Sequence, residues 1–197
     1  MTTLTTRILL SLLILTAPTA FAAPREVPAT ELKTLFQPYA SVSELDVDFR
    51  QTKTIRGLKT PLKSTGHLKV RQPDLVEWTV LKPSYLQARM QGRKMTLTTG
   101  QGENQRTQAV PESETGSLSA LVAWMRFDVE QLAKDYTVTE LGSNWYSFAP
   151  QKPESAPLNK IDVELGPERK LKTLVLHEKS GDRIEIAFES PKVKNKK

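Results

Sequence analysis

Apolar and polar residues alternate along the first half of the chain with a period of two. Residues 45–50 read Leu-Asp-Val-Asp-Phe-Arg, so apolar side chains point one way and charged side chains the other. Residues 64–70 repeat the alternation, and Pro73 follows them closely. This pattern is typical of strands with one buried face. It predicts two half-buried strands, the second of which ends at a proline corner.

A third strand and a hairpin are predicted beyond Pro73. Trp78 shares its face with the valines two residues before and after it, and Pro83 ends the run. Two further apolar alternations, at residues 88–90 and 95–97, are separated by a Gln-Gly pair. Glycine in a short polar connection between alternating segments favours a hairpin turn.

Helical periodicity appears before the first strand. Residues 28–37 carry an apolar stripe at helical spacing, with Thr30 as the expected cap and Pro38 as the expected end. By contrast, residues 100–116 are polar and contain glycines and a proline. We expect a loop there.

Two more helices are predicted after this loop. From Ser117, apolar residues recur at spacings of three and four as far as Met125, and Ser117 is the expected cap. Asp128 is expected to cap a second, short helix that runs through Ala133.

The last third of the chain returns to strand-like alternation. Five strands are expected, at residues 136–141, 145–149, 161–165, 171–178 and 183–188. Glycine-containing turns are expected between them at residues 142–144, 166–167 and 180–182. Strands, then helices, then strands again predict a mainly β protein with helices, of the α+β class, in which an antiparallel sheet holds a helical insertion.

The first 22 residues have the composition of a signal peptide. One basic residue, Arg7, precedes an apolar run at residues 8–15, and residues 20–22 form a small-x-small cleavage site. We expect export with cleavage after Ala22, which leaves residues 23–197 as one soluble domain. The chain has no cysteine, so neither a disulfide nor a lipid anchor on cysteine is expected.

The chain is moderately basic, with 28 Lys and Arg against 22 Asp and Glu. Export separates it from nucleic acid, so no nucleic-acid partner is expected. The basic residues are scattered apart from residues 192–197, which hold four lysines. Two interpretations of this tail are open: a solvated, frayed end, which we favour, or a segment weakly attracted to anionic lipid headgroups.

Catalytic and metal-binding patterns are missing from the sequence. His67 and His177 are the only histidines, each in an expected strand and without a second ligand at metal-binding spacing. His177 is followed by Glu as in an H-E-x-x-H motif, but Gly181 stands where the second histidine belongs. There is no nucleophile elbow and no phosphate-binding loop. We therefore expect no enzymatic activity, no metal and no cofactor.

Three short motifs in the first half resemble the periplasmic outer-membrane lipoprotein carrier family, LolA. They are F-x-Q at residues 49–51, S-x-G at residues 64–66 and P-x-x-x-x-W-x-x-x-x-P at residues 73–83, in the family's order. The resemblance implies a strongly curved antiparallel sheet, an incomplete barrel, with a helical lid over its concave face.

The resemblance also implies a function and partners. It points to a soluble periplasmic carrier that binds the acyl chains of lipoproteins, or another lipid, in a hydrophobic cup for transport toward the outer membrane. The implied donor is an inner-membrane transporter complex, and the implied acceptor lies in the outer membrane. Such a carrier is expected to be a monomer and to touch membranes only transiently.

The same resemblance assigns roles to apolar residues. The residues expected to line the lipid cavity are Leu45, Val47, Phe49, Leu68, Val70, Val76, Trp78, Met90, Met95 and Leu97. The residues expected on the lid are Leu118, Leu121, Val122, Trp124 and Met125. The pattern by itself leaves a second interpretation open, a packed core made of the same residues. The unbranched methionines suit a surface that adapts to chains of varying shape.

One position departs from the family pattern. In the family, an arginine often precedes the first proline of the P-x-x-x-x-W motif and helps to hold the lid shut, whereas this chain has Gln72 there. Arg71 and Arg89 are further candidates for contacts with the lid. The departure leaves two alternatives open: a carrier of another lipid or polyketide-like product in a dedicated biosynthetic or export pathway, or a structural or sensory domain of the same fold.

Overall fold

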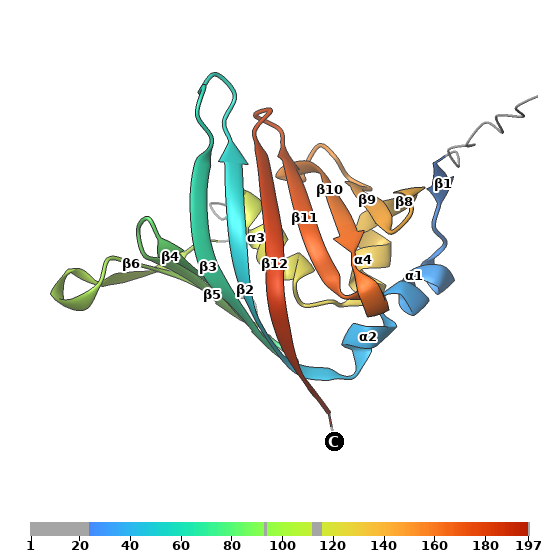
Figure 1. Ribbon diagram of the computed structural model, residues 1–197, viewed down its shortest axis with the longest axis horizontal. Helices are drawn as coiled ribbons and strands as arrows, with labels where there is room; N and C mark the ends of the chain where they lie inside the picture. Colours follow the sequence, from blue (N-terminus) through green and yellow to red (C-terminus); the bar gives the residue numbers. More distant parts are fainter. Residues whose placement is uncertain (1–23, 93, 112–115, 197) are drawn as a thin grey trace, which may run out of the picture.

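One antiparallel sheet of twelve strands dominates the structure (Figure 1). The computed structural model describes residues 24–92, 94–111 and 116–196, so the expected signal peptide, residues 1–22, lies outside the described residues. The order across the sheet is β1-β8-β9-β10-β11-β12-β2-β3-β4-β5-β6-β7. The sheet curves strongly but does not close into a barrel, which confirms the expected architecture.

The elements are placed along the chain as follows. The strands are β1 (Arg25–Glu26), β2 (Val42–Thr54), β3 (Leu62–Arg71), β4 (Leu75–Lys82), β5 (Leu86–Gln91), β6 (Lys94–Thr99), β7 (Arg106–Val110), β8 (Tyr136–Gly142), β9 (Trp145–Pro150), β10 (Leu158–Leu165), β11 (Leu171–Glu178) and β12 (Arg183–Asn195). The helices are α1 (Ala29–Leu35), α2 (Gln37–Ala40), α3 (Gly116–Trp124) and α4 (Val129–Asp135), with 3-10 turns η1 (Gly102–Asn104) and η3 (Pro167–Arg169).

The concave face of the sheet is apolar because the alternation stays in register from strand to strand. Val47 of β2 lies opposite Leu68 of β3, and Leu68 lies opposite Trp78 of β4. On the other side of β2, Phe49 lies opposite Phe188 of β12. Directly paired residues of antiparallel strands point to the same face. The apolar positions of neighbouring strands therefore add up to one continuous surface, with the charged positions on the convex face.

The three motifs that resemble the LolA family form one packed unit on this surface. Gly66 of the S-x-G motif pairs with Phe49 of the F-x-Q motif. A Cβ atom at Gly66 would lie 2.1 Å from the carbonyl oxygen of Thr79 and 2.4 Å from the Phe49 ring. The Phe49 ring stacks in turn on Trp78, with centroids 3.9 Å apart. Glycine is required here because the ring and the β4 backbone occupy the space of a side chain.

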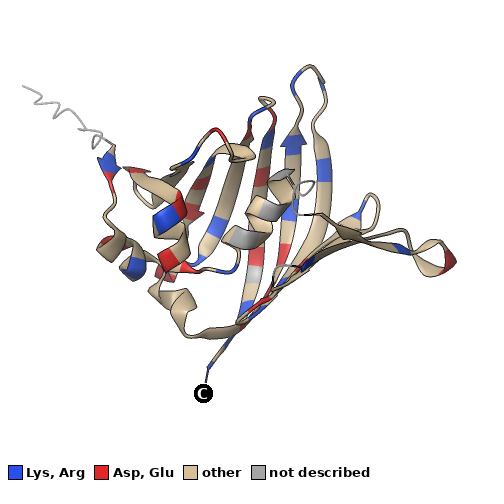
Figure 2. Cartoon of the chain, turned by 180° about the vertical axis from the view of Figure 1, so that it is seen from behind, with Lys and Arg blue, Asp and Glu red and all other residues tan. Residues whose placement is uncertain are grey.

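The helices lie on the concave side of the sheet, as Figure 2 shows from behind. An aromatic cluster fixes them there. Trp124, at the end of α3, packs edge-on against Phe36 and against Phe148 of β9, with ring centroids 5.7 and 5.6 Å away. Phe127 stacks on Tyr39 of α2 at 4.2 Å. The cluster ties α3 to the first two helices and to the far half of the sheet.

The N-terminal helical segment differs from the prediction in its start and its end. α1 begins after Pro28, whose side chain makes no capping hydrogen bond, so Thr30 lies inside the helix and is not its cap. Pro38 does not end a helix but lies in the first turn of the four-residue helix α2. Proline is tolerated there because the first turn of a helix has no partner for its N–H groups.

The predicted cap of α3 is wrong, and the predicted cap of α4 is confirmed. Ser117 is not a cap, because α3 already begins at Gly116. Asp128 caps α4 as expected, since its Oδ1 accepts a hydrogen bond of 3.1 Å from the backbone N–H of Gln131.

The prediction of a loop at residues 100–116 is wrong in part. Within this stretch, residues 106–110 form strand β7, which pairs with β6 along its length. Residues 112–115 lie outside the described residues. Four of the five residues of β7 are exposed, so the strand has no buried face that an apolar alternation could mark.

The prediction of a frayed C-terminal end is wrong as far as Asn195. Strand β12 continues to this residue beside β2, with Lys192 opposite Asp46 and Lys194 opposite Glu44. Opposite charges on facing strand positions stabilise the pairing. Lys194 also forms an ion pair with Glu44, 3.4 Å away, so the described end of the chain lies in the sheet as far as Asn195.

Candidate functional site

A cavity of about 400 Å³ lies between the concave face and helix α3. Seven apolar side chains line it, and four polar ones complete the wall. The apolar residues are Trp78, Val80, Leu86, Leu118, Leu121, Leu176 and Ile184. The polar residues are Gln51, Lys53, Ser117 and Glu178. A volume of this size, with mostly apolar walls and a few polar groups, suits a small apolar ligand.

The cavity is confined to one half of the concave face. Its wall residues on the sheet lie toward the β2–β3, β4–β5 and β11–β12 turns, and the others lie on α3. Towards the opposite end the same face is filled by side chains, and Leu45, Val70 and Val76 are almost completely buried there. The concave face thus has a hollow half and a packed half.

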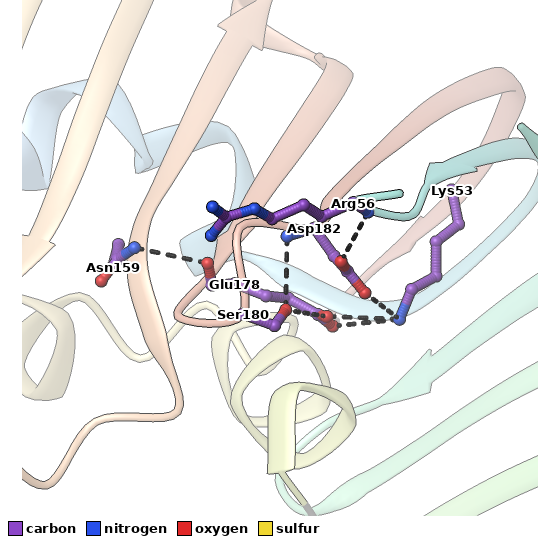
Figure 3. A network of polar contacts seen from close by, with 6 residues as sticks. All are labelled: Lys53, Arg56, Asn159, Glu178, Ser180 and Asp182. Atoms are coloured by element: carbon purple, nitrogen blue, oxygen red, sulfur yellow. Dashed lines mark hydrogen bonds and ion pairs between the residues drawn. The ribbon is translucent and has the colours of Figure 1, made fainter. Parts of the chain in front are cut away.

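A polar network forms the rim of the hollow half (Figure 3). The Lys53 ammonium lies 3.2 Å from Glu178 and 3.7 Å from Asp182. Asp182 also accepts a hydrogen bond of 3.0 Å from the backbone N–H of Arg56, and Ser180 contacts Glu178. These contacts join the β2–β3 hairpin to the β11–β12 turn. They place paired charges at the edge of an otherwise apolar space.

The residues expected to line the cavity all lie on the concave face or against its core, but they divide between the two halves. Trp78 is part of the cavity wall. Phe49 lies directly behind it, stacked on its indole ring. Leu45, Val47, Leu68, Val70, Val76 and Met95 are buried in the core, and Met90 and Leu97 are partly buried against it. Strand alternation identifies the face that a residue occupies but not its position along the hollow.

The expected lid residues divide in the same way. Leu118 and Leu121, in the first turns of α3, line the cavity. Val122, Trp124 and Met125 are buried in the core beyond it. The indole N–H of Trp124 is buried without a hydrogen-bond partner in the described part of the chain. Leaving such a donor unpaired costs roughly 1–3 kcal/mol in the arrangement of α3 that the structure shows.

Gln72 lies in contact with the segment between α3 and α4. Its side-chain amide donates a hydrogen bond of 2.9 Å to the carbonyl oxygen of Arg126. The Arg126 guanidinium reaches in turn to the carbonyl oxygen of Gly92, 3.4 Å away in the β5–β6 turn. Residue 126 is thus held to the sheet twice, once through its backbone and once through its side chain.

The other two candidates for lid contacts face the convex side. Arg71 lies 3.7 Å from Glu44, and Arg89 lies 3.2 Å from Glu77. Neither makes a hydrogen bond or ion pair with α3 or α4 in the described residues. Arg126 was not predicted as a contact, because its single basic side chain carries no signal of its own in the sequence.

Both histidines are held by aspartates on the convex face. His67 lies between Asp46 and Asp48, at 3.0 and 2.9 Å, and His177 lies 2.7 Å from Asp162. Burial acts to raise the pKa of Asp162, but hydrogen bonds from neighbouring side chains hold it below its ordinary value. Among the described residues, no cluster of three or more potential metal ligands is found. These histidines form cross-strand polar contacts on the outside of the sheet.

A curved, open antiparallel sheet with helices on its concave side is the LolA-like fold. The chain belongs to the LolA family: the family model described as outer membrane lipoprotein carrier protein LolA matches residues 40–197. The curated proteins include no match to the chain. No helix within the described residues is long and apolar enough to span a membrane.

Solved structures with a similar course of the chain share little sequence with it. A DUF1329 family protein from Desulfovibrio piger has 8% identity and a TM-score of 0.48, covering 84% of this chain and 91% of that chain. A LolA superfamily protein from Nitrosomonas europaea has 10% identity and a TM-score of 0.47, covering 87% and 96%. The lipoprotein LppX from Mycobacterium tuberculosis has 13% identity and a TM-score of 0.40, covering 82% and 92%.

Proposed function

We propose that this protein is a carrier that encloses the acyl chain of a lipid or lipoprotein in the cavity between the concave face and α3. The observation that carries the proposal is the cavity itself, with seven apolar side chains in its wall and paired charges at its rim. Such a wall replaces water around an acyl chain, and the rim offers polar groups to the part of the cargo that stays in water.

The energetic case for a carrier follows from the size of the cavity. A group the size of a water molecule occupies roughly 30 Å³, so about 13 methylene-sized groups fill the space. Each buried methylene contributes about 0.8 kcal/mol, and a chain of this length gains roughly 10 kcal/mol on leaving water. A chain with that preference for apolar surroundings does not cross an aqueous compartment by itself.

The same volume bears on the cargo. A cavity of about 400 Å³ accommodates one acyl chain and not three. This favours a cargo with a single chain over a triacylated lipoprotein held entirely inside. A lipid or polyketide-like product of a dedicated pathway is therefore the second candidate. A structural domain with a permanently filled core is disfavoured by the hollow half.

Release requires α3 to move, and the lid contacts are suited to that. We define the lid as residues 116–135, which contain α3 and α4. Gln72 holds it with one neutral hydrogen bond, which contributes about 1 kcal/mol. The unpaired N–H of Trp124 opposes closure. The polar contacts of the lid are few, so opening depends mainly on separating Trp124 and Phe127 from the aromatic cluster.

The remaining parts of the proposal concern compartment and partners. Residues 1–22 act as a cleaved signal peptide, and residues 23–197 form one soluble domain in the periplasm of a Gram-negative cell. The mature protein works as a monomer, takes cargo from an inner-membrane transporter complex, hands it to an outer-membrane acceptor and catalyses no reaction. N-terminal sequencing of protein from a periplasmic extract tests cleavage after Ala22.

Filling the cavity tests the carrier function directly. Val80 lines the hollow half, and Val80→Phe should weaken binding of a fluorescent fatty acid while the fold stays intact. Val193→Phe is the matched control, because Val193 lies in strand β12 with 42% of its surface exposed. Equal affinity for the probe in wild type and Val80→Phe would refute binding in this cavity. Native mass spectrometry of protein from the periplasm then identifies the cargo.

A further inference from the structure

The positive charge of the chain is concentrated in one segment. Residues 49–73 contain seven Lys and Arg and no Asp or Glu. The rest of the chain holds 21 Lys and Arg against 22 Asp and Glu, which nearly balance. The net positive charge of the protein therefore comes from residues 49–73, which form the second half of β2, the loop after it and β3. Figure 2 shows Lys and Arg along this hairpin.

The loop of this hairpin is also the most exposed apolar part of the chain. Every residue from 56 to 63 is exposed. Leu58 and Leu62 each have 55% of their surface exposed, the largest values among the exposed large apolar residues of the described chain. Figure 1 shows the hairpin projecting beyond the neighbouring turns at the upper end of the sheet. Exposed apolar side chains grouped at a projecting tip mark a surface of interaction.

The charged side chains at the tip have no acidic partners. Arg56, Lys59 and Lys63 form no ion pair with another described residue, whereas Arg50, Lys69 and Arg71, farther along the strands, each face a carboxylate. The base of the loop is fixed, because the backbone N–H of Arg56 donates to Asp182. The tip thus presents leucines and uncompensated positive charge on a supported hairpin.

We propose that the tip of the β2–β3 hairpin, residues 56–63, docks the protein onto membranes that contain anionic lipid. Lysine and arginine attract anionic headgroups, and the two leucines enter the boundary between headgroups and acyl chains. An acidic peptide would account for the basic residues of the tip but not for its exposed leucines, which a purely ionic contact does not use.

The position of the cavity fits this docking. Gln51 and Lys53, which line the cavity, stand on β2 a few residues before the loop. Glu178 and Ile184, also in the wall, flank the β11–β12 turn that supports the hairpin. Docking through the tip therefore brings the rim of the cavity next to the lipid surface, and not the packed half of the sheet.

Binding to vesicles tests the proposal with cargo-free protein, so failure here leaves cargo binding in the cavity untouched. We expect binding to vesicles of equal parts phosphatidylcholine and phosphatidylglycerol, little binding to pure phosphatidylcholine, and loss at high ionic strength. K59Q/K63Q should weaken binding about 25-fold, at roughly fivefold per charge. K94Q/K152Q, which removes two exposed lysines outside the tip and the lid, is the matched control and should bind as wild type does.

The leucines are tested separately. Leu58→Ser should weaken binding about tenfold, while Leu141→Ser, at a leucine with 42% of its surface exposed on β8, should not. Because the chain has no cysteine, an environment-sensitive dye placed through Leu58→Cys reports insertion at that site alone. Its emission should shift to the blue with anionic vesicles, and a dye at Leu141→Cys should not respond.

Three results would overturn the proposal. The first is the absence of binding to anionic vesicles. The second is binding that K59Q/K63Q leaves unchanged but K192Q/K194Q/K196Q abolishes, which would assign the contact to the C-terminal strand. The third is a dye at residue 58 that stays in water while the protein sediments with the vesicles.

Discussion

The hydrogen bond from Gln72 to Arg126 gives the sharpest test of how the lid is held. Gln72→Ala removes the donor and leaves the Arg126 carbonyl oxygen without this partner. Gln72 is only partly buried, so water can replace the amide, and the loss is about 1 kcal/mol. If the lid opens as a unit, the open population rises about fivefold.

Hydrogen exchange measures this population. Amides of α3 that exchange through lid opening should do so about fivefold faster in Gln72→Ala, while amides of β10 and β11 should keep their rates. Gln87→Ala is the matched control. Gln87 donates a comparable side-chain hydrogen bond of 3.3 Å to Thr79, also partly buried, but it lies on β5 away from the lid.

Equal exchange rates of α3 in wild type and Gln72→Ala would contradict this role of Gln72. An equal acceleration of α3 in Gln87→Ala would also contradict it, since the effect would then be a general loss of stability. Gln72→Arg should slow exchange, because a guanidinium forms a stronger, charge-assisted bond to the same carbonyl. The Arg126 guanidinium, held at Gly92, limits this gain through repulsion between like charges.

The other predictions concern stability and can be checked by chemical denaturation. Gly66→Ala should destabilise the fold by about 3 kcal/mol, because the added Cβ meets the Thr79 backbone; Gly166→Ala, where the nearest atoms are 3.6 Å away, should be nearly neutral. Asp162 has a lowered pKa in the folded state, so its stabilisation is present above the ordinary value of 3.8 and is lost as the pH falls through the folded value. Asp162→Asn should therefore flatten the acid dependence of stability, and an unchanged slope would contradict this. Asp128→Ala should cost about 1 kcal/mol through the lost cap, and unaltered stability would show that α4 does not need it. Trp124→Phe keeps a ring but removes the unpaired N–H. It should lower the free energy of unfolding by less than the lost side-chain volume alone would.

Sequence alternation recovered the strands that have one buried face. Residues 45–50 alternate because one side meets the core and the other meets water, and their strand was found for that reason. Strand β7 was missed because it lies at the sheet edge with its side chains exposed. The end of β12 was missed because its lysines are exposed, and the strand is marked by its pairing with β2 and by the Lys194–Glu44 ion pair and not by burial. Hydrophobic periodicity does not mark a strand that is exposed at the sheet edge or that pairs through charged side chains.

The sequence predicted which face of the sheet holds the candidate site but not how far the cavity extends along that face. Phe49 and Trp78 follow the same alternation, yet one is stacked behind the other and only Trp78 reaches the cavity. The Lys53–Glu178 pair at the rim joins residues far apart in the chain, on β2 and β11. Neither the depth of a side chain nor a contact across the sheet is encoded in the spacing of neighbouring residues. Both follow from the curvature of the whole sheet and the helix that crosses it.

The place of β12 in the sheet has a consequence for the order of folding. The last strand of the chain pairs with β2, near its beginning, from Arg183 opposite Thr54 to Asn195 opposite Val42. The paired strands β12 and β2 lie in the middle of the sheet and not at an edge. Pairings between distant parts of a chain close large loops and form slowly. The cup therefore cannot be assembled until β12 has been synthesised, and removal of this strand would split the sheet into two halves, neither with a complete cavity wall.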